Sequence, residues 1–578
     1  NKYKQTVKGI YIDPPYNTGG DDFVYKDNYR HSSWITLIEN RTALAKDLLC
    51  NTGAHFTHID ENEINNLMLA YKDIYSENNF INLITIKTKV AGVSGSHLGK
   101  SLKNSSEYIT LFCKSHNDFR LTDKVHERQE LIEFIEDMKE EGKSWKYTSV
   151  LQNVDEGEYI KSIKDGSGEE IKIFSHKKYE FKSINAIAAE QHDGDTKKAY
   201  YANIDGVFRT TNAQSSIRQR VIDETKDTDG ELVSIVYTPK KGRNANKQVR
   251  LYYKDKAKNL ITFLRDVCEV DNDIVYKLTN SGNLWTDIQY NNIAKEGGTS
   301  FDQGKKPVYA IEKCLNMVSD ENETFLDYFA GSGTTGHAVI NLNREDDGQR
   351  KYILVEMGEY FDAVTKPRIQ KVIYSKDWKD GEPVSREGIS QCFKYIRLES
   401  YEDALNNLTL KRADAAQGVL DANEKIREQY LLHYMLDTES KGSVLDLNAF
   451  AKPFDYQLMI NRGDDTRARK VDLVETFNYL IGLYVEQMRF IDDVCVVNGK
   501  TREGEAVLIL WRDAEKLDAA KLDKWFEDNR EALNPSAYST IYVNGDNTLQ
   551  GQVGKGDDWS VKLIEEAFHR LMFNETSL

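Results

Sequence analysis

The segment Asp13-Pro14-Pro15-Tyr16 combines residue types that suit chemistry on the exocyclic amino group of a nucleic-acid base. The lone pair of such an amino group is delocalised into the aromatic ring, so its nitrogen is a poor nucleophile. A carboxylate (Asp13) beside a backbone carbonyl that proline holds in place (Pro14) offers two hydrogen-bond acceptors that would localise this pair. The ring of Tyr16 offers a face on which a flipped base can stack. The alternative is a diproline turn in which Tyr16 only packs.

A second candidate site is the glycine segment Gly331-Ser332-Gly333-Thr334-Thr335-Gly336, which matches the GxGxxG pattern of adenosine-binding loops. The glycines let the backbone turn tightly against a ligand. Glu356, 20 residues beyond Gly336, can accept hydrogen bonds from two ribose hydroxyls. No lysine follows the glycines, so this is not a Walker loop. NAD, FAD and S-adenosylmethionine remain candidate ligands, as does a glycine turn that binds nothing.

Asp327, just before the glycine loop, favours one of these ligands. A carboxylate suits a ligand with a cationic amino-acid end, such as S-adenosylmethionine, and would repel a pyrophosphate. Ser332 and Thr335 have no evident His and Asp partners. We therefore interpret them as loop hydroxyls near the cofactor and not as nucleophiles.

The elements that must position these residues follow from hydrophobic periodicity. Strands are predicted at 7–12, 54–59, 80–86, 108–113, 323–329 and 351–356, and helices at 34–49 and 337–344. In the first helix, Trp34, Leu37, Leu44 and Leu48 are expected to form the core stripe. Alternating strands and helices favour a largely parallel sheet covered by helices.

The composition indicates an ordinary folded chain of several domains: 578 residues, 40% hydrophobic, 29% charged, net charge −16. No apolar run approaches the roughly 18 residues of a membrane helix, and no signal peptide is evident, which favours a cytoplasmic protein. The six cysteines lie far apart, and His55 and His58 point to opposite faces of a strand, so no metal site is expected. Because the chain begins with Asn1 shortly before Asp13, we expect that an N-terminal part of the natural protein is missing.

A basic stretch lies inside the region where the alternation breaks down, residues 118–282. Residues 239–250 carry five positive charges and no acid. Contact with DNA phosphates is the functional interpretation, and a solvated loop is the alternative. The residues predicted to contact DNA are Arg209, Arg218, Arg220, Lys240, Lys241, Arg243 and Lys247.

Taken together, the two motifs resemble those of the amino-methylating DNA methyltransferases in their β arrangement. There the catalytic motif comes first, the target recognition region second and the cofactor loop last. Asp13 to Tyr16 matches the catalytic motif, and Phe329-Ala330-Gly331-Ser332-Gly333 matches the cofactor motif. The resemblance implies that Lys306 and Pro307 lie in the segment that closes over the methionine part of S-adenosylmethionine, with Asp13 also beside the cofactor, and that Glu356 is the ribose-binding acid. The Asp-first motif is typical of N6-adenine enzymes, whereas N4-cytosine enzymes more often begin it with Ser.

Residues 393–403 and 472–480 extend this resemblance to the modification (Mod) subunits of type III restriction-modification systems. The resemblance implies a site-specific adenine-N6 methyltransferase that acts on double-stranded DNA, forms a Mod homodimer and pairs with a restriction (Res) subunit. One alternative is an N4-cytosine enzyme of the same architecture. Another is a DNA-binding specificity module whose methylation site is vestigial.

The expected fold is α/β: a Rossmann-like, seven-stranded mixed sheet built from residues 1–117 and 283–385. A target recognition domain, residues 118–282, would interrupt this sheet. An α/β C-terminal assembly domain would follow at 390–578, with a helix over 471–488.

Overall fold

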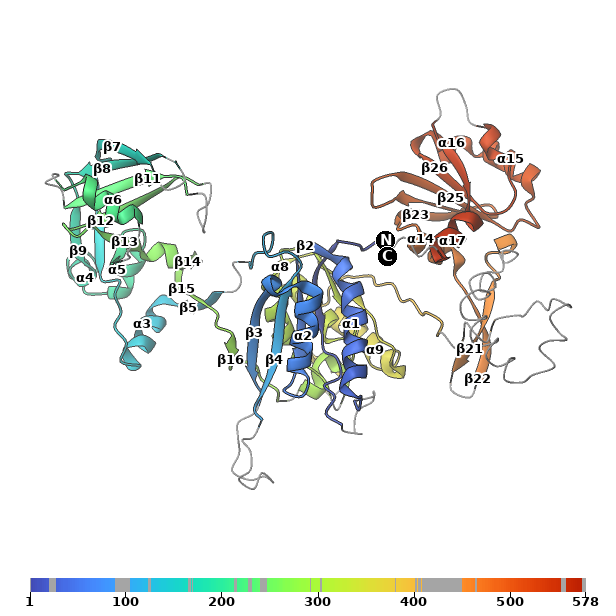
Figure 1. Cartoon of the computed structure of the whole chain (residues 1–578), viewed down its shortest axis with the longest axis horizontal. Coiled ribbons are helices and arrows are strands. Elements are labelled where there is room, and N and C mark those ends of the chain that lie inside the picture. The colour runs from blue at the N-terminus through green and yellow to red at the C-terminus, as the bar shows by residue number, and fades with distance from the viewer. Residues whose placement is uncertain are drawn as a thin grey trace, which may run out of the picture.

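The computed structural model describes residues 2–19, 27–88, 104–122, 126–164, 168, 170–212, 216–226, 231–239, 247–291, 293–301, 304–379, 381–400, 403, 407, 450–462, 465–552 and 558–573. These residues form three main sheets (Figure 1): one is built from segments on both sides of an insertion, the second lies within that insertion, and the third belongs to the last part of the chain. The sheet that carries both sequence motifs contains the first strands of the chain.

This first sheet has seven strands in the order β16-β3-β4-β2-β1-β17-β18. Its strands are β1 (Val7–Ile12), β2 (Leu49–Ile59), β3 (Phe80–Lys87), β4 (Ser106–Cys113), β16 (Leu284–Trp285), β17 (Thr324–Asp327) and β18 (Lys351–Leu354). Strand β4 runs antiparallel to both of its neighbours, and the other pairings are parallel. The predicted seven-stranded mixed sheet is therefore confirmed. Strand β1 lies between β2 and β17. Strands β2, β3, β4 and β16 lie on one side of β1 and strands β17 and β18 on the other, so the strand order reverses at β1.

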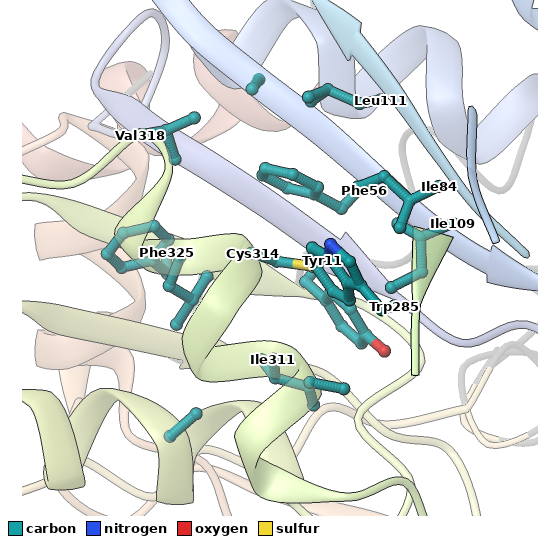
Figure 2. Close-up of a cluster of buried hydrophobic side chains, with 14 of the residues drawn as sticks. Tyr11, Phe56, Ile84, Ile109, Leu111, Trp285, Ile311, Cys314, Val318 and Phe325 are labelled. Carbon is teal, nitrogen blue, oxygen red and sulfur yellow. The ribbon is translucent and has the colours of Figure 1, made fainter. Parts of the chain in front are cut away.

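Helices cover both faces of this sheet because its central strands are apolar on both sides. On one face α1 (His31–Leu48) and α2 (Ile64–Tyr75) pack on Ile10 and Ile12. On the other, α7 (Val308–Asn316) and α8 (Thr334–Asp346) pack around Tyr11, Phe56 and Phe325 (Figure 2). A further helix of this unit, α9 (Thr365–Tyr374), packs beside α8. Both layers thus fix β1, the strand that leads directly into Asp13.

Glycine is required at one point of β1. A Cβ at Gly9 would lie 2.6 Å from a ring carbon of Phe325, which itself is fully buried. The missing side chain lets the Phe325 ring from β17 lie against β1, so the two strands that end at the candidate site pack without a gap.

The insertion between β4 and β16 forms an eight-stranded antiparallel sheet of order β7-β8-β11-β12-β13-β10-β6-β9. Its strands are β6 (Ser149–Gln152), β7 (Glu158–Lys164), β8 (Glu170–His176), β9 (Glu180–Ser183), β10 (Val207–Thr211), β11 (Leu232–Tyr237), β12 (Val249–Lys254) and β13 (Asn259–Phe263). Its helices are α3 (Leu131–Glu140), α4 (Ile184–Gln191), α5 (Thr196–Ala202) and α6 (Ser216–Glu224). The chain enters through β5 (His126–Glu130) and leaves through β15 (Ile274–Asn280), which pair antiparallel, with β14 (Cys268–Asp271) on the other side of β15.

The last part of the chain contains a five-stranded mixed sheet of order β23-β24-β25-β26-β27, which confirms an α/β C-terminal domain. The strands are β23 (Tyr484–Ile491), β24 (Val494–Lys500), β25 (Ala506–Arg512), β26 (Thr540–Val543) and β27 (Ser560–Leu563). Helices α14 (Leu473–Leu480) and α17 (Ile564–Phe573) cover one face, and α15 (Ala519–Asp528) and α16 (Arg530–Leu533) cover the other. Two hairpins precede this sheet along the chain: β19 (Trp378–Lys379) with β20 (Glu382–Pro383), and β21 (Gln457–Arg462) with β22 (Asp465–Lys470).

Two local predictions are wrong. The helix expected over 471–488 ends at Leu480, because Gly482 adopts φ 68° and the Leu483 N–H donates to Asn478 O (2.9 Å) in a helix-terminating turn. The following residues form β23 instead. In α1 the buried stripe is Trp34, Ile38, Thr42 and Ala45, whereas Leu44 is 59% exposed.

Candidate functional site

The two sequence motifs meet at one edge of the seven-stranded sheet. Asp13 follows β1 directly, Asp327 is the last residue of β17, and Glu356 lies two residues beyond β18. These three strands are parallel neighbours, so their carboxyl ends share an edge. Ligands of open α/β sheets bind at this edge, where the strand order reverses.

A buried tryptophan anchors the Asp-Pro-Pro-Tyr loop. Trp34 on α1 donates its indole N–H to the carbonyl of Pro15 (2.7 Å). Asn17 continues the loop at φ 60° and donates its side-chain amide to Glu63 (2.6 Å), which is buried. Asp27 accepts hydrogen bonds from the backbone N–H groups of Asn17 (2.7 Å) and Thr18 (3.0 Å). The loop is thus held at Pro15 and at Asn17 and Thr18, on either side of Tyr16, while Asp13 is positioned by strand β1, which it follows directly.

Asp13 shares a largely buried pocket with a lysine and a second carboxylate. The ammonium of Lys306 lies 3.4 Å from Asp13 Oδ1 and 3.8 Å from Glu107 Oε2. It also lies 4.5 Å from the centre of the Tyr16 ring, a cation–π distance. Burial raises the pKa of Asp13, and the nearby Lys306 charge opposes that rise. Asp13 Oδ1 is buried without a hydrogen bond from any described residue, so it is free to accept one from a ligand.

Glu107, on β4, is the centre of hydrogen bonding in this pocket. Its Oε2 accepts from the hydroxyls of Tyr16 and Tyr290, each at 3.3 Å, and lies 2.9 Å from Nε2 of His58. Burial alone would raise the pKa of Glu107, but Lys306, His58 and Tyr16 together hold it well below its usual range. Glu107 is therefore a carboxylate at neutral pH.

Asp327 is 3% exposed and organises the start of the glycine loop. Its Oδ1 accepts from the Phe329 N–H (3.0 Å), and its Oδ2 accepts from the Thr335 hydroxyl (2.5 Å). Burial raises its pKa to about 7, despite these two hydrogen bonds. A cationic ligand group placed nearby would favour the ionised form.

The glycine loop has the backbone geometry of a ligand cradle. Gly331 and Gly333 adopt φ 51° and 82°, values that L side chains rarely adopt. A Cβ built on Gly331 would meet only the Phe329 carbonyl, at 3.9 Å, so the space in front of this residue is open. A Cβ on Gly333 would lie 3.1 Å from the Thr365 side chain, so the loop packs closely on the side of α9.

Glu356 is fixed against this loop by backbone groups. Its Oε2 accepts from the Gly331 N–H (2.7 Å), and its Oε1 accepts from the N–H groups of Met357 (2.9 Å) and Gly358 (2.8 Å). Carboxylate oxygens have about four acceptor positions, so acceptor capacity remains for a ligand hydroxyl. Beyond Glu356, Met357 is 91% exposed and offers an apolar surface beside the loop.

The loop hydroxyls have structural partners. Arg368 on α9 is fully buried and donates to Ser332 Oγ and Thr334 Oγ1, both at 2.8 Å. Burial lowers the pKa of this guanidinium to about 10. The Ser332 hydroxyl thus accepts a hydrogen bond from Arg368, and its interpretation as a loop hydroxyl near the cofactor stays a prediction.

The two histidines of β2 are both buried and point to different partners. His55 lies 2.8 Å from the Tyr75 hydroxyl, and His58 Nδ1 lies 2.8 Å from the Tyr11 hydroxyl. Within the described part of the chain, no three His, Cys, Asp or Glu side chains gather as a metal site would require. Nor does any helix of the described residues have the length and apolarity to span a membrane.

The predicted DNA-contacting residues lie in the inserted unit, some of them outside the described residues. Arg209 on β10 stacks 5.1 Å from the Tyr147 ring, and Arg218 on α6 donates to the carbonyls of Ala257 (2.7 Å) and Lys258 (2.8 Å). Arg220 donates to the Lys164 carbonyl, and Lys247 is exposed. Lys240, Lys241 and Arg243 lie outside the described residues.

Sequence reasoning missed Glu107, His58 and Arg368. Each belongs to no motif and reaches the site only through the fold, from β4, β2 and α9 respectively. One signal existed for Glu107: it is the only charged residue in the strand segment 106–113, where every other residue is uncharged.

Comparison with known proteins agrees with this geometry. A protein-family model described as a DNA methylase matches residues 7–366. The chain is similar to the Mod subunit of the probable type III restriction-modification enzyme HindVI of Haemophilus influenzae: 36% identity over 460 residues, covering 79% of this chain and 59% of that protein. It is also similar to the StyLTI Mod subunit of Salmonella typhimurium (25% identity; 69% and 55% covered) and the EcoP15I Mod subunit of Escherichia coli (25%; 62% and 56%). The chain thus spans somewhat more than half the length of these relatives.

Proposed function

Because this chain belongs to the DNA methylase family, we propose that it transfers a methyl group from S-adenosylmethionine to the N6 amino group of adenine in double-stranded DNA. We further propose that it does so as the modification subunit of a type III restriction-modification system in the cytoplasm. The observation that carries the proposal is that Asp13, Asp327 and Glu356 lie at the ends of three adjacent parallel strands. A base-binding loop and an adenosine-binding loop thereby share one edge.

The residues of the glycine loop fit S-adenosylmethionine. The Glu356 carboxylate, held by three backbone N–H groups, would accept the ribose hydroxyls, while the open backbone at Gly331 would admit the ligand. Asp327 would attract the cationic amino group of the methionine part. Phe329, Ser332, Gly333, Thr335 and Pro307 would complete the cofactor site. When bound, this cofactor supplies a methyl group attached to a positively charged sulfur.

The Asp-Pro-Pro-Tyr loop would bind and activate the target base. Asp13 Oδ1, which accepts no hydrogen bond from the described residues, and the carbonyl of Pro14 would accept the two amino protons, which localises the lone pair on the nitrogen. Tyr16 would stack on the flipped ring, and its hydroxyl is already fastened to Glu107. The Trp34 hydrogen bond to Pro15 keeps this geometry in place before the base arrives, so little reorganisation is needed at the moment of reaction.

The two remaining parts of the chain have proposed roles outside the chemistry. The inserted unit, residues 118–282, would recognise the target sequence, and the part from 390 to 578 would mediate assembly of a Mod homodimer and contact with a Res subunit. The similarity to three Mod subunits of type III restriction-modification enzymes supports these roles.

Product analysis tests the methylation proposal. We expect that incubating the chain with labelled S-adenosylmethionine and unmethylated bacterial DNA, followed by digestion to nucleosides, yields N6-methyldeoxyadenosine. Sequencing the genome of an expressing host for N6-methyladenine would then identify the recognition sequence. If the label were found in N4-methyldeoxycytidine instead, the target base would be cytosine and not adenine. DNA binding without any labelled base would indicate a vestigial site and overturn the proposal.

A second prediction concerns the basic stretch of the inserted unit. Replacing Lys240, Lys241, Arg243 and Lys247 with glutamine should weaken DNA binding and flatten its dependence on salt by about one unit of slope per lost phosphate contact. Fluorescence anisotropy with one duplex at several salt concentrations measures both quantities. The matched control replaces Lys500, Lys516, Lys521 and Lys524 of the C-terminal domain and should leave the slope unchanged. A wild-type slope in the first variant would show that these side chains are only solvated.

A further inference from the structure

We infer that Lys306 and Glu107 are a pair of positioning residues for the methyl transfer: Lys306 keeps the Asp13 side chain ionised, and Glu107 holds Lys306 in place beside it. This inference rests on the proposed function and assigns a role to two residues at its site. By resemblance, Lys306 was expected to contact the cofactor, and Glu107 was assigned no role. The contacts of both side chains instead place them at the catalytic loop.

The first step of the argument is the position of the Lys306 ammonium. It lies between the two carboxylates, 3.4 Å from Asp13 and 3.8 Å from Glu107, and its side chain is 10% exposed. Burial alone would lower the pKa of Lys306, but the two carboxylates raise it above its ordinary value. The side chain therefore carries its charge throughout the physiological range, so Asp13 has a permanent counter-charge on one side.

The second step is that Glu107 holds this ammonium from the opposite side. Glu107 is itself fixed by Tyr16, Tyr290 and His58, at 3.3, 3.3 and 2.9 Å. His58 is fixed in turn by the hydroxyl of Tyr11, two residues before Asp13 on β1 (2.8 Å). The contacts therefore run from Asp13 through Lys306, Glu107 and His58 to Tyr11, which lies on β1, the strand that leads into Asp13. They fix the position of the Lys306 ammonium relative to Asp13.

The third step is the balance of charge around Asp13. Lys306, from the segment before α7, and His58, on β2, favour its ionised form. Glu107, on β4, opposes ionisation, and Asp13 and Asp327 likewise repel one another. Without Lys306, Asp13 would lie near the carboxyl groups of Glu107 and Asp327 with no lysine beside it. Asp13 would then take up a proton and lose acceptor capacity for the target amino group.

The pH dependence of single-turnover methylation tests this assignment. For Lys306→Gln we expect the acid limb of the rate profile to move upward by at least about one pH unit, because the stabilising charge is lost. For Glu107→Gln we expect it to move downward, because a repelling carboxylate is lost. Lys306→Arg should restore the wild-type limb. Lys313→Gln is the matched control, because Lys313 lies on α7 and pairs with Asp287 (2.9 Å), outside this pocket.

A second measurement reports the charge of Asp13 without relying on turnover. Infrared difference spectra of protein labelled with ¹³C at its aspartate carboxyl groups, with Asp13→Asn to identify the band, should show Asp13 ionising at higher pH in Lys306→Gln than in the wild type. Identical Asp13 titrations in these two proteins would overturn the inference. So would pH-independent losses of the same size in Lys306→Gln and Glu107→Gln. Absence of methylation by the wild type would instead contradict the proposed function, while the infrared titration would still decide the charge pairing.

Discussion

Replacing Asp13 with alanine should reduce the single-turnover rate of methyl transfer by at least about 10²-fold, comparable to the loss of one preorganised electrostatic partner. The variant lacks the side-chain acceptor that would localise the lone pair of the target amino group. DNA affinity should change little, because phosphate contacts elsewhere supply most of it. Rate and affinity are to be measured on the same duplex, with the rate followed by incorporation of labelled methyl groups.

The control for Asp13→Ala is Asp73→Ala, which removes an exposed aspartate from α2 and should leave the rate unchanged. If Asp13→Ala retained most of the wild-type rate, the Pro14 carbonyl would suffice as acceptor and the carboxylate mechanism would be wrong. Equal losses of rate and DNA affinity would indicate collapse of the loop and would argue against a purely chemical role.

Replacing Gly331 with valine should weaken binding of S-adenosylmethionine by at least about tenfold, which corresponds to roughly 1.4 kcal/mol. The branched side chain would fill the open space in front of the loop, and it disfavours the φ of 51° found at this residue. Because the Gly331 N–H donates to Glu356, any shift of this backbone also moves the proposed ribose acceptor. Isothermal titration calorimetry measures the affinity directly.

A control substitution at a second glycine distinguishes the loss of space for the ligand from the effect of backbone strain. Gly381 lies in the tight turn between β19 and β20, has φ 87°, and has no neighbouring atom that a Cβ would meet. Gly381→Val should therefore destabilise folding through the backbone while leaving cofactor affinity unchanged. Unaltered affinity in Gly331→Val would remove the glycine loop from the cofactor site.

Hydrophobic periodicity predicted six of the seven strands of the first sheet, and the family resemblance implied the seven-stranded mixed sheet; strand β16 (Leu284–Trp285) was not predicted. Strand β1 is a short apolar run ended by two prolines, and β17 leads into a glycine loop, so periodicity and turn chemistry agree there. Membership of the DNA methylase family confirms the resemblance drawn from these two motifs. The roles of their individual residues stay predictions.

The pocket behind Asp13 could not be predicted in the same way. Glu107 is 94 residues from Asp13 in the chain, and Lys306 is 293 residues away, so only the pairing of β4 and the course of the segment before α7 bring them together. The helix expected over 471–488 failed for a different reason. A glycine in the left-handed region ended it, while the apolar pattern of β23 continued the apparent periodicity.

The pairing of β5 with β15 has an evolutionary consequence. The inserted unit leaves and rejoins the seven-stranded sheet through two neighbouring antiparallel strands, with Glu130 opposite Tyr276 and His126 opposite Asn280. This connection requires only that the two ends of an inserted segment lie side by side, whatever the length or internal fold of the segment. An exchange of the inserted unit at these two strands would therefore leave the edge with Asp13, Asp327 and Glu356 intact. Under the proposed division of roles, such an exchange would change the recognised sequence in one step while the residues proposed for methyl transfer stay the same.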